Sequence, residues 1–367
     1  GLVPKLVKDG FEGTIFCNSA TRDLCTIMLS DSAHIQEADT KRANRRRLEK
    51  GLEPYEVLYD QTNVDDALKL FQIVIFMMKT MNKFAVFILT HGRANNVITY
   101  SALRKQGYTG PIYLMIDDED KQIENYKKLY GNQVVVFNKQ KAIDYTDSGD
   151  NFKKRNSVVY ARNWNFVVAK EMGIDYFLQL DDDYGNFYNT FDNFGNYITQ
   201  HRKLDNLDKV CEAMVQFLID SKADSVCMSQ GGDFIGGPGS KISKLAKQGK
   251  FSRKAMNAFF MNTNKPFKFM GRINEDVNAY VALGNVGKLF ITVPRIRLEQ
   301  GTTQANAGGL TDIYLDLGTY VKSFYSVMYA PSCIKITEMG VTNKRLHHRV
   351  KWKHAVPEIV SERIKKE

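Results

Sequence analysis

The chain has 367 residues, of which 43% are hydrophobic and 25% charged, and its formal net charge is +10. It is long enough for two or three domains, and it holds no apolar run of about 18 residues, so we expect no membrane-spanning helix. Five scattered cysteines without a Cys-x-x-Cys pair argue against a zinc ribbon or a disulfide framework and indicate a reducing compartment, the cytoplasm, while the positive charge favours a polyanionic partner.

Charge divides the chain into two unlike pieces, residues 1–76 and 77–367. The first piece carries 10 Lys/Arg against 12 Asp/Glu, and the second carries 41 against 29. Gly10–Gly13, Ala20–Leu24 and Asp31–Glu37 resemble an internal stretch of the metallo-β-lactamase/β-CASP RNA nucleases. That family's His-x-His-x-Asp-His signature is missing, because the histidines are His34, His91, His201, His347, His348 and His354. We therefore expect an accessory segment or fragment without a complete metal site.

From residue 83 the pattern alternates strand and helix. Apolar runs at 84–89, 111–116 and 133–138 predict buried strands, and helical stretches at 97–106 and 121–130 separate them. This alternation is typical of a mostly parallel sheet with crossover helices. Polar clusters follow the first two strands, Thr90–Arg93 and Asp117–Asp118, at the carboxyl ends where such sheets bind ligands.

The next strand runs directly into three carboxylates. A helix over 164–172 ends at Gly173, and the apolar run 174–180 leads into Asp181, Asp182 and Asp183. Adjacent like charges repel unless a cation lies among them. Mg²⁺ and Mn²⁺ prefer carboxylate oxygens and leave positions open for substrate phosphates. The run therefore predicts a metal–diphosphate site, with an acidic turn as the alternative.

A glycine-rich loop and a basic stretch follow the strand predicted at 225–230. The loop Gly231–Gly239 has five glycines in nine residues and lacks the ending of a phosphate-binding P-loop. From Phe234 to Asn274 there are nine basic residues and no acid. Basic residues neutralise phosphates, and the interleaved Phe251, Phe259, Phe260, Phe267 and Phe269 are candidates to stack on an extruded base. The alternative is a solvated helix over core phenylalanines. The DNA-contact candidates are Lys241, Lys244, Lys247, Lys250, Arg253, Lys254 and Arg272.

An acidic pair, Glu275 and Asp276, follows this stretch at the start of an apolar helical segment. Acids in the first turn favour helix capping, and a carboxylate is also a candidate general base. Near the C-terminus, Lys344–His354 holds half of the chain's histidines.

The order helix, Gly, strand and Asp-Asp-Asp resembles the way GT-A glycosyltransferases present their Asp-x-Asp motif. The chain is similar over about residues 83–367 to the TET-associated glycosyltransferases of phages and their relatives, the base J glucosyltransferases, which modify hydroxymethylated pyrimidines in DNA. The resemblance implies a GT-A-like (Rossmann-like) α/β fold, a nucleotide-sugar half over about 83–190 and an acceptor half over about 225–367. It also implies a location in the host cytoplasm if the protein is phage-encoded.

The resemblance implies roles for particular residues. The donor would be a UDP-sugar with Mn²⁺ or Mg²⁺, and the partner would be double- or single-stranded DNA carrying hydroxymethylated pyrimidines. Asp276, with Glu275 as second choice, would be the general base. The metal ligands would be Asp181 and Asp183, with His347 or His348 as a third. The nucleotide contacts would be Thr90, Arg93, Asp117, Asp118, Arg155, Arg162, Asn163 and Asp182.

Two other enzyme activities use the same pattern. A GT-A transferase acting on a saccharide or a protein would keep the metal site without binding DNA, and a nucleotidyltransferase would share the metal chemistry. The sugar, the choice between hydroxymethylcytosine and hydroxymethyluracil, the stereochemical outcome and the oligomeric state do not follow from the sequence.

Overall fold

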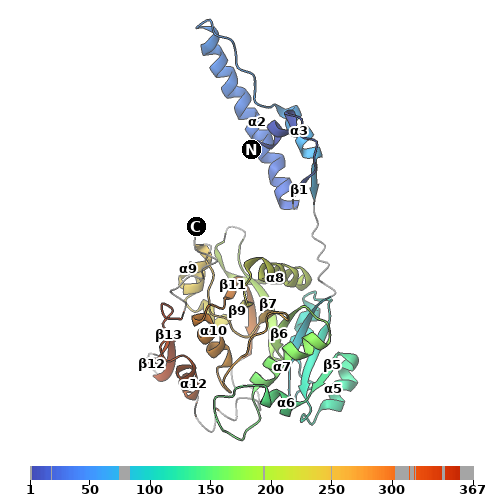
Figure 1. The fold of residues 1–367 in the computed structure, drawn as a ribbon, viewed down its shortest axis with the longest axis vertical. Helices are drawn as coiled ribbons and strands as arrows, with labels where there is room; N and C mark the ends of the chain where they lie inside the picture. Colours follow the sequence, from blue (N-terminus) through green and yellow to red (C-terminus); the bar gives the residue numbers. More distant parts are fainter. Residues whose placement is uncertain are drawn as a thin grey trace. The chain divides into compact units, whose positions relative to one another are not determined.

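The structure is a computed structural model that describes residues 2–17, 19–73, 83–192, 195–248, 250–301, 314, 318, 320–340 and 344–355. The chain forms two compact units, Gly1–Lys79 and Thr80–Glu367 (Figure 1). The division lies three residues beyond the one expected from charge. No helix in these ranges is long and apolar enough to cross a membrane.

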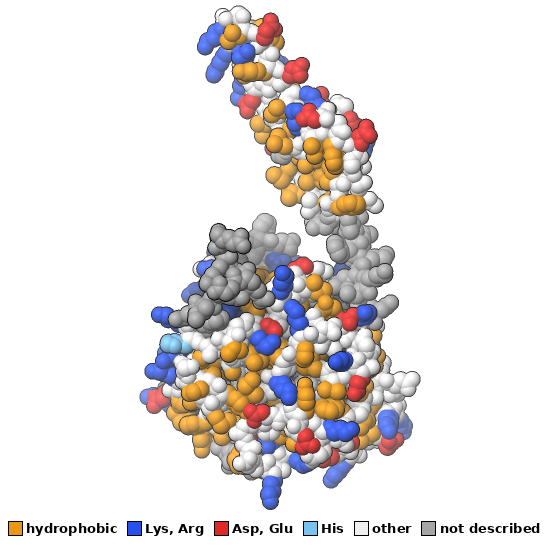
Figure 2. All heavy atoms as spheres, in the orientation of Figure 1, with side chains coloured by type: hydrophobic (Ala, Val, Ile, Leu, Met, Phe, Trp, Pro, Cys, Tyr) orange, Lys and Arg blue, Asp and Glu red, His pale blue; other side chains and the backbone are white. Residues whose placement is uncertain are grey.

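The N-terminal unit is a small α/β segment with its own core. Helices α1 (Val3–Lys8), α2 (Ser19–Leu48) and α3 (Gln61–Lys69) surround a parallel pair of short strands, β1 (Ile15–Cys17) and β2 (Phe71–Ile73). Leu29, Ala33, Tyr59, Val64 and Phe71 form the core. Large apolar side chains also remain on its surface, notably Phe16 on β1 and Leu24, Ile27 and Met28 on α2, and Figure 2 shows hydrophobic groups gathered there.

The second unit is built on a nine-stranded sheet in the order β5-β4-β3-β6-β10-β9-β11-β7-β8. Its first half is parallel and comprises β5 (Val134–Phe137), β4 (Ile112–Asp117), β3 (Phe84–Leu89) and β6 (Tyr176–Asp181). All six residues of β3 are buried, which requires cover on both faces of the sheet. Helices α4 (Ile98–Lys105), α5 (Ile123–Tyr130), α6 (Lys139–Asp144) and α7 (Val158–Glu171) connect and flank these strands (Figure 1).

The second half of the sheet is largely antiparallel. β10 (Phe259–Asn262) runs against both β6 and β9 (Ser225–Gln230), and β11 (Phe290–Gln300) runs parallel to β9 and antiparallel to β7 (Tyr184–Phe191). β8 (Tyr197–Lys203) closes the edge. The remaining elements are α8 (Leu207–Ser221), α9 (Lys241–Lys247), α10 (Glu275–Asn285), α12 (Val321–Tyr329) and the hairpin of β12 (Ile334–Met339) and β13 (Arg345–Val350).

The predicted α/β class, a GT-A-like sheet flanked by helices beside a small N-terminal α/β segment, is confirmed. The strands predicted at 84–89, 111–116, 133–138, 174–180 and 225–230 all occur, with ends shifted by at most a few residues. Within the nine-stranded sheet, half of the pairs of neighbouring strands are antiparallel. β7, β8 and β11 were not predicted from the sequence, because polar residues interrupt the apolar pattern that marks a buried strand. β10 is apolar in its first three residues but is only four residues long, and it was not predicted either.

We predict that deletion of residues 1–79 leaves the second unit folded, because each unit has a core of its own. Thermal unfolding followed by circular dichroism should show a cooperative transition at the temperature of the main transition of the full chain. Deletion of residues 1–89 is the matched control, since it also removes the buried central strand β3 and should abolish folding. Loss of the cooperative transition in the shorter deletion would show that the second unit depends on the first.

Candidate functional site

The carboxyl ends of the parallel strands border one pocket of ≈ 470 Å³. Three polar segments that lie far apart in the chain meet there, because β4, β3 and β6 are parallel neighbours whose ends lie at the same edge of the sheet. The first turn of α10 and the segment 155–162 also contribute to the wall. Among the predicted site residues, those that line this pocket are Thr90, Arg93, Asp117, Arg155, Arg162, Asp181, Asp182, Asp183, Glu275 and Asp276.

The three adjacent aspartates have different surroundings. Asp181 accepts hydrogen bonds from Arg162 at 3.0 Å and from the hydroxyl of Tyr184 at 3.0 Å. Asp182 is 4% exposed and accepts from Arg93 at 2.9 Å and from Thr90 at 2.7 Å. The triad is therefore held in place by its first two members, and its third is left for another partner.

Asp183 carries a buried carboxylate oxygen, Oδ1, that has no hydrogen-bond partner among the described residues. Burial, followed by the charges of Asp181 and Asp182, raises the pKa of Asp183 to about 6. Buried polar oxygens are normally satisfied, so an unpaired one at the wall of a pocket indicates a missing ligand. A divalent cation that prefers oxygen ligands fits both the free oxygen and the excess of negative charge.

The predicted third ligand is not brought to this position. His347 and His348 lie on β13 and do not line the pocket, although His348 Nδ1 is 3.4 Å from the side-chain nitrogen of Asn274, which does. Burial, with the charges of His347, Lys322 and Lys254, lowers the pKa of His348 to about 4. Within the described ranges no three His, Cys, Asp or Glu side chains cluster as a metal site. A cation held by Asp183 would thus take further ligands from water or from the substrate.

Arg162 is the centre of the pocket wall. Its side chain is 3% exposed, and it donates from Nε to Glu275 at 2.9 Å and from Nη2 to Asp181 at 3.0 Å. The guanidinium carbon also lies 5.6 Å and 5.9 Å from the ring centres of Phe259 and Phe269. Two of its three nitrogens are thus committed to carboxylates, which gives Arg162 a bridging role, while its direct contact with a nucleotide stays a prediction.

The acidic pair lies in the first turn of α10, and both carboxyl groups are buried. Burial raises the pKa of Glu275 to about 7 against the opposing charge of Arg162. Burial also raises the pKa of Asp276, whose Oδ1 accepts from the backbone N–H of Val277 at 2.7 Å. A carboxylate whose pKa is raised is a stronger base, which is the property that proton abstraction from a hydroxyl requires.

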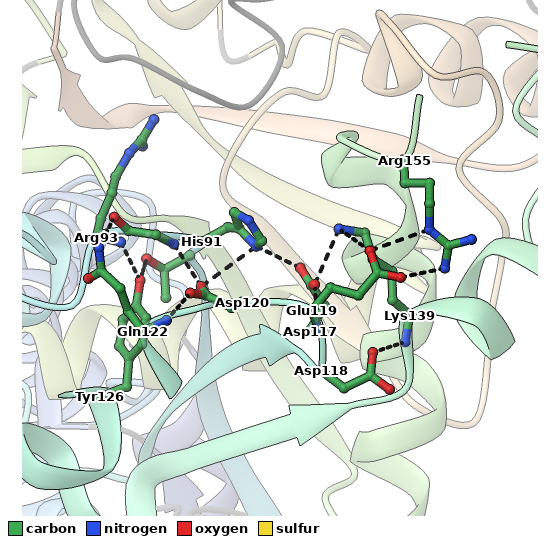
Figure 3. Close-up of polar contacts among 12 residues, drawn as sticks. His91, Arg93, Asp117, Asp118, Glu119, Asp120, Gln122, Tyr126, Lys139 and Arg155 are labelled. Carbon is green, nitrogen blue, oxygen red and sulfur yellow. Dashed lines mark hydrogen bonds and ion pairs between the residues drawn. The ribbon is translucent and has the colours of Figure 1, made fainter. Parts of the chain in front are cut away.

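A second polar network lies at the end of β4 (Figure 3). His91 Nδ1 is 2.8 Å from Asp117 and 3.6 Å from Asp120, and Lys139 pairs with both Asp117 at 3.2 Å and Glu119 at 3.5 Å. Burial opposes ionisation of Asp117, but His91 and Lys139 outweigh it and lower the pKa of this carboxyl. The hydrogen bond to Asp117 raises the pKa of His91.

His91 and Lys139 also line the pocket. His91 lies within the predicted cluster Thr90–Arg93 but had no role assigned to it, and Lys139 was not predicted from the sequence. His91 directly follows Thr90 at the end of β3, and Lys139 begins α6 two residues after β5. Position at the end of a parallel strand was therefore the available signal. Arg155 extends the network through its 2.6 Å ion pair with Glu119.

Two predicted nucleotide contacts lie elsewhere. Asp118 accepts from the side chain of Asn138 and the backbone of Lys139, so it caps the start of α6 outside the pocket lining. Asn163 is 1% exposed and exchanges hydrogen bonds with the backbone of Phe269 at 2.8 Å and 2.9 Å. Its role is to anchor that segment, so the assignment to a ligand contact is corrected.

The basic stretch separates into surface and core. Lys241, Lys244, Lys247, Lys250 and Arg253 are exposed, whereas Lys254 pairs with Asp233 at 2.7 Å. Arg272 is 2% exposed and pairs with Asp150 at 2.9 Å, so its charge is not offered to a surface partner. Phe259, Phe260, Phe267 and Phe269 are buried. The suggested stacking of these four rings on a base is therefore wrong, and Phe251 alone of the five is exposed.

Comparison with known proteins gives a match to one family model. A family described as TET-associated glycosyltransferase matches residues 84–309. No curated protein matches the chain. The resemblance of residues 1–76 to RNA nucleases lies outside the matched range and finds no support in these comparisons.

Several solved structures are similar to the chain at low identity. Glucosyl-3-phosphoglycerate synthase from Mycobacterium tuberculosis, in complex with Mg²⁺ and UDP, is 9% identical over 73% of this chain and 87% of its own, with a TM-score of 0.37. TarS 1–349 of S. aureus in complex with UDP-GlcNAc is 14% identical over 67% of this chain and 66% of its own, with a TM-score of 0.34. GalNAc-T7 with UDP, GalNAc and Mn²⁺ is 12% identical over 59% of this chain and 43% of its own, with a TM-score of 0.36.

We predict that divalent-cation binding at this pocket is controlled by ionisation of Asp183. Its pKa of about 6 means that the cation must displace a proton below that pH, so affinity for Mn²⁺ should fall about tenfold between pH 7 and pH 5. Isothermal titration of the protein with Mn²⁺ at both pH values measures this. The Asp183→Asn variant should bind Mn²⁺ weakly at both pH values. A wild-type affinity for Mn²⁺ that does not change with pH would contradict the assignment of Asp183 as the cation ligand.

We predict that Arg162→Met destabilises the protein by about 3–5 kcal/mol, because it leaves the buried Glu275, and Asp181 with a side chain 25% exposed, without their counter-charge. The pKa of Glu275 is already raised, and loss of Arg162 raises it further. The folded state then holds a proton that the unfolded state releases, so the loss should be larger at pH 8 than at pH 6. Urea unfolding at the two pH values measures it.

Arg155→Met is the matched control for Arg162→Met. It also removes an arginine from an ion pair, but Arg155 and Glu119 are 39% and 44% exposed in their side chains, so the loss should stay below about 1 kcal/mol. Equal losses for the two variants, or a loss at Arg162 that does not depend on pH, would contradict the buried network.

Proposed function

The chain belongs to the TET-associated glycosyltransferase family, and from this premise we propose that it transfers a sugar from a UDP-sugar to the hydroxyl group of a 5-hydroxymethylpyrimidine in DNA, with Mn²⁺ or Mg²⁺. Family membership makes the protein a glycosyltransferase that uses a nucleotide sugar. The observation that supports the specific proposal is the presence of Asp183 and Asp276 in one pocket. The first offers a free oxygen for a cation, and the second offers a buried base.

The nucleotide half of the pocket supports donor binding. Asp117, His91 and Lys139 form a fixed, paired network at the end of β4, where hydroxyl groups or an imide of the donor can be hydrogen-bonded. Arg155 lies on the same wall and offers a planar cation that suits phosphate oxygens. A divalent cation bound at Asp183 would supply Lewis-acid stabilisation to the leaving diphosphate.

The acidic pair supports deprotonation of the acceptor. Glu275 accepts a hydrogen bond from Arg162, whereas the described residues show no such bond between Arg162 and Asp276. Asp276 is therefore the better candidate to take the proton from the acceptor hydroxyl. Glu275 and Arg162 then act as positioning residues, because they fix the start of α10 against the end of β6. The base would act most strongly when it is ionised, which requires a pH above its raised pKa.

The DNA acceptor is supported by the family and by charge. Three lysines lie on the exposed side of α9, namely Lys241, Lys244 and Lys247. Lys250 and Arg253, which follow α9 in the chain, are also exposed. Exposed cations of this kind neutralise phosphates and make binding dependent on salt. A hydroxymethyl group on a base within a duplex would reach the pocket after the base is extruded from the stack.

We predict that the protein adds a sugar to DNA that contains hydroxymethylcytosine or hydroxymethyluracil. Mass spectrometry of the nucleosides after incubation with Mn²⁺ and a panel of UDP-sugars should show a sugar-sized gain on one nucleoside. Asp276→Asn should lower the transfer rate at least about a hundredfold, because it removes the general base. Lys128→Gln, an exposed change on α5 away from the pocket lining, should transfer like the wild type.

The same experiment distinguishes the other acceptors. Slow hydrolysis of a UDP-sugar without a gain on any nucleoside would move the acceptor to a saccharide or a protein. Appearance of a nucleotide adduct would indicate a nucleotidyltransferase. Transfer by Asp276→Asn at the wild-type rate would overturn the assignment of the base.

A further inference from the structure

The antiparallel half of the sheet carries a polar and aromatic surface next to the pocket. The register of β11, β7 and β8 pairs Arg297 with Tyr188 and Tyr188 with Lys203. Directly paired residues lie on the same face of a sheet, so the three side chains lie in a row across the strands. We call the surface formed by Tyr188, Tyr197, His201, Lys203 and Arg297 the Tyr188 face.

Planar groups gather on the Tyr188 face. The guanidinium carbon of Arg297 lies 5.4 Å from the ring centre of Tyr188. His201 is next in the cluster, with ring centres 6.0 Å from Tyr188 and 5.5 Å from Tyr197. Tyr188 is partly exposed, so this cluster is open to a partner. Tyrosine rings with an adjacent arginine are the groups on which single-stranded nucleic-acid bases stack.

Two buried polar atoms of the Tyr188 face have no hydrogen-bond partner among the described residues, Nε of Arg297 and Nδ1 of His201. Because buried polar atoms are normally paired, these two indicate a ligand with hydrogen-bonding edges. Gln230 pairs with Leu298, the neighbour of Arg297, so its side chain lies on the opposite face of the sheet, where it lines the pocket. The next residue, Gly231, lies beside Arg297, so the chain at 230–231 borders both the pocket and the Tyr188 face.

The glycine-rich loop packs beside this surface. A Cβ atom at Gly231 would contact Nη2 of Arg297 at 3.7 Å, and one at Gly237 would contact the ring of Tyr197 at 3.8 Å. Phe234 of the same loop stacks on Tyr197, with ring centres 5.5 Å apart. The loop therefore partly covers Tyr197, and Tyr188 with Arg297 is the part of the face available to a flat partner.

Charge on the Tyr188 face suits a phosphate backbone. Lys203 is exposed, and α9 with its three exposed lysines packs against β11 and the glycine-rich loop. Glu299, an acid on the same face, is occupied by hydrogen bonds from Tyr188 at 3.1 Å and Asn186 at 2.6 Å. Burial, with the charge of Arg297, lowers the pKa of His201, so its neutral ring is suited to stacking.

We propose that the Tyr188 face binds a nucleotide that neighbours the target in the acceptor strand, stacking its base on Tyr188 and Arg297. The inference rests on the proposed DNA acceptor, and it places the flanking nucleotide on the antiparallel half of the sheet while the target hydroxyl lies in the pocket. Gly185 connects the two, since it follows Asp183 by two residues and its Cβ position is 3.6 Å from Glu299.

Fluorescence anisotropy with a short single-stranded oligonucleotide that contains one hydroxymethylcytosine tests the proposal without requiring transfer. Tyr188→Ala and Arg297→Gln should each weaken binding about five- to a hundredfold, the range found for loss of one base-stacking contact. Tyr188→Phe keeps the ring and should retain most of the affinity. Lys128→Gln removes one exposed positive charge from α5 and controls for charge alone, and thermal unfolding controls for folding.

The outcomes separate this inference from the proposed function. Equal binding by the wild type, Tyr188→Ala and Arg297→Gln would overturn the inference, even if sugar transfer to DNA is observed. Selective weakening in the two variants would support it, even if no donor yields a product. Equal weakening in Tyr188→Phe and Tyr188→Ala would show that the ring is not a stacking platform and would overturn it, as would absence of DNA binding by the wild type.

Discussion

The arrangement of this site depends on one buried ion network, in which Arg162 bridges Asp181 and Glu275. The arginine comes from α7, the aspartate from the end of β6 and the glutamate from the start of α10. Breaking such a network is costly, because it leaves a charge buried without compensation. The network therefore fixes the distance between the strand that carries the aspartates and the helix that carries the acidic pair. It holds Asp183 and Asp276, which follow Asp181 and Glu275 in the chain, in the wall of one pocket.

Negative charge where the end of β6 meets the start of α10 is only partly compensated. Five of the carboxylates that line the pocket lie there, those of Asp181, Asp182, Asp183, Glu275 and Asp276, and the arginines bonded to members of this group are Arg93 and Arg162. The imbalance, together with burial, explains why the pKa values of Asp183 and Glu275 are raised to about 6 and about 7. It also explains why a divalent cation and a phosphate-bearing donor suit this wall better than an anion alone.

The two halves of the sheet serve the pocket differently. Parallel strands bring their carboxyl ends to one edge and place there the polar groups for which we propose nucleotide contacts. The antiparallel strands run past that edge and expose a face of their own, on which Tyr188 and Arg297 lie beside the glycine-rich loop. A polymeric acceptor needs such an extended surface, because the groups that flank its reacting hydroxyl must be bound as well.

The sequence by itself determined the α/β class, the parallel strands and the meeting of Thr90, Asp117 and Asp181–Asp183 at one edge. These follow from local hydrophobic patterns and from the rule that parallel strands share a direction. Tertiary structure alone decided the partners of each charge. Arg162, Asn163 and Arg272 look alike to a sequence reader as exposed polar residues, yet each is buried against groups more than 15 residues away. Long-range packing selects those partners, and a local pattern does not record it.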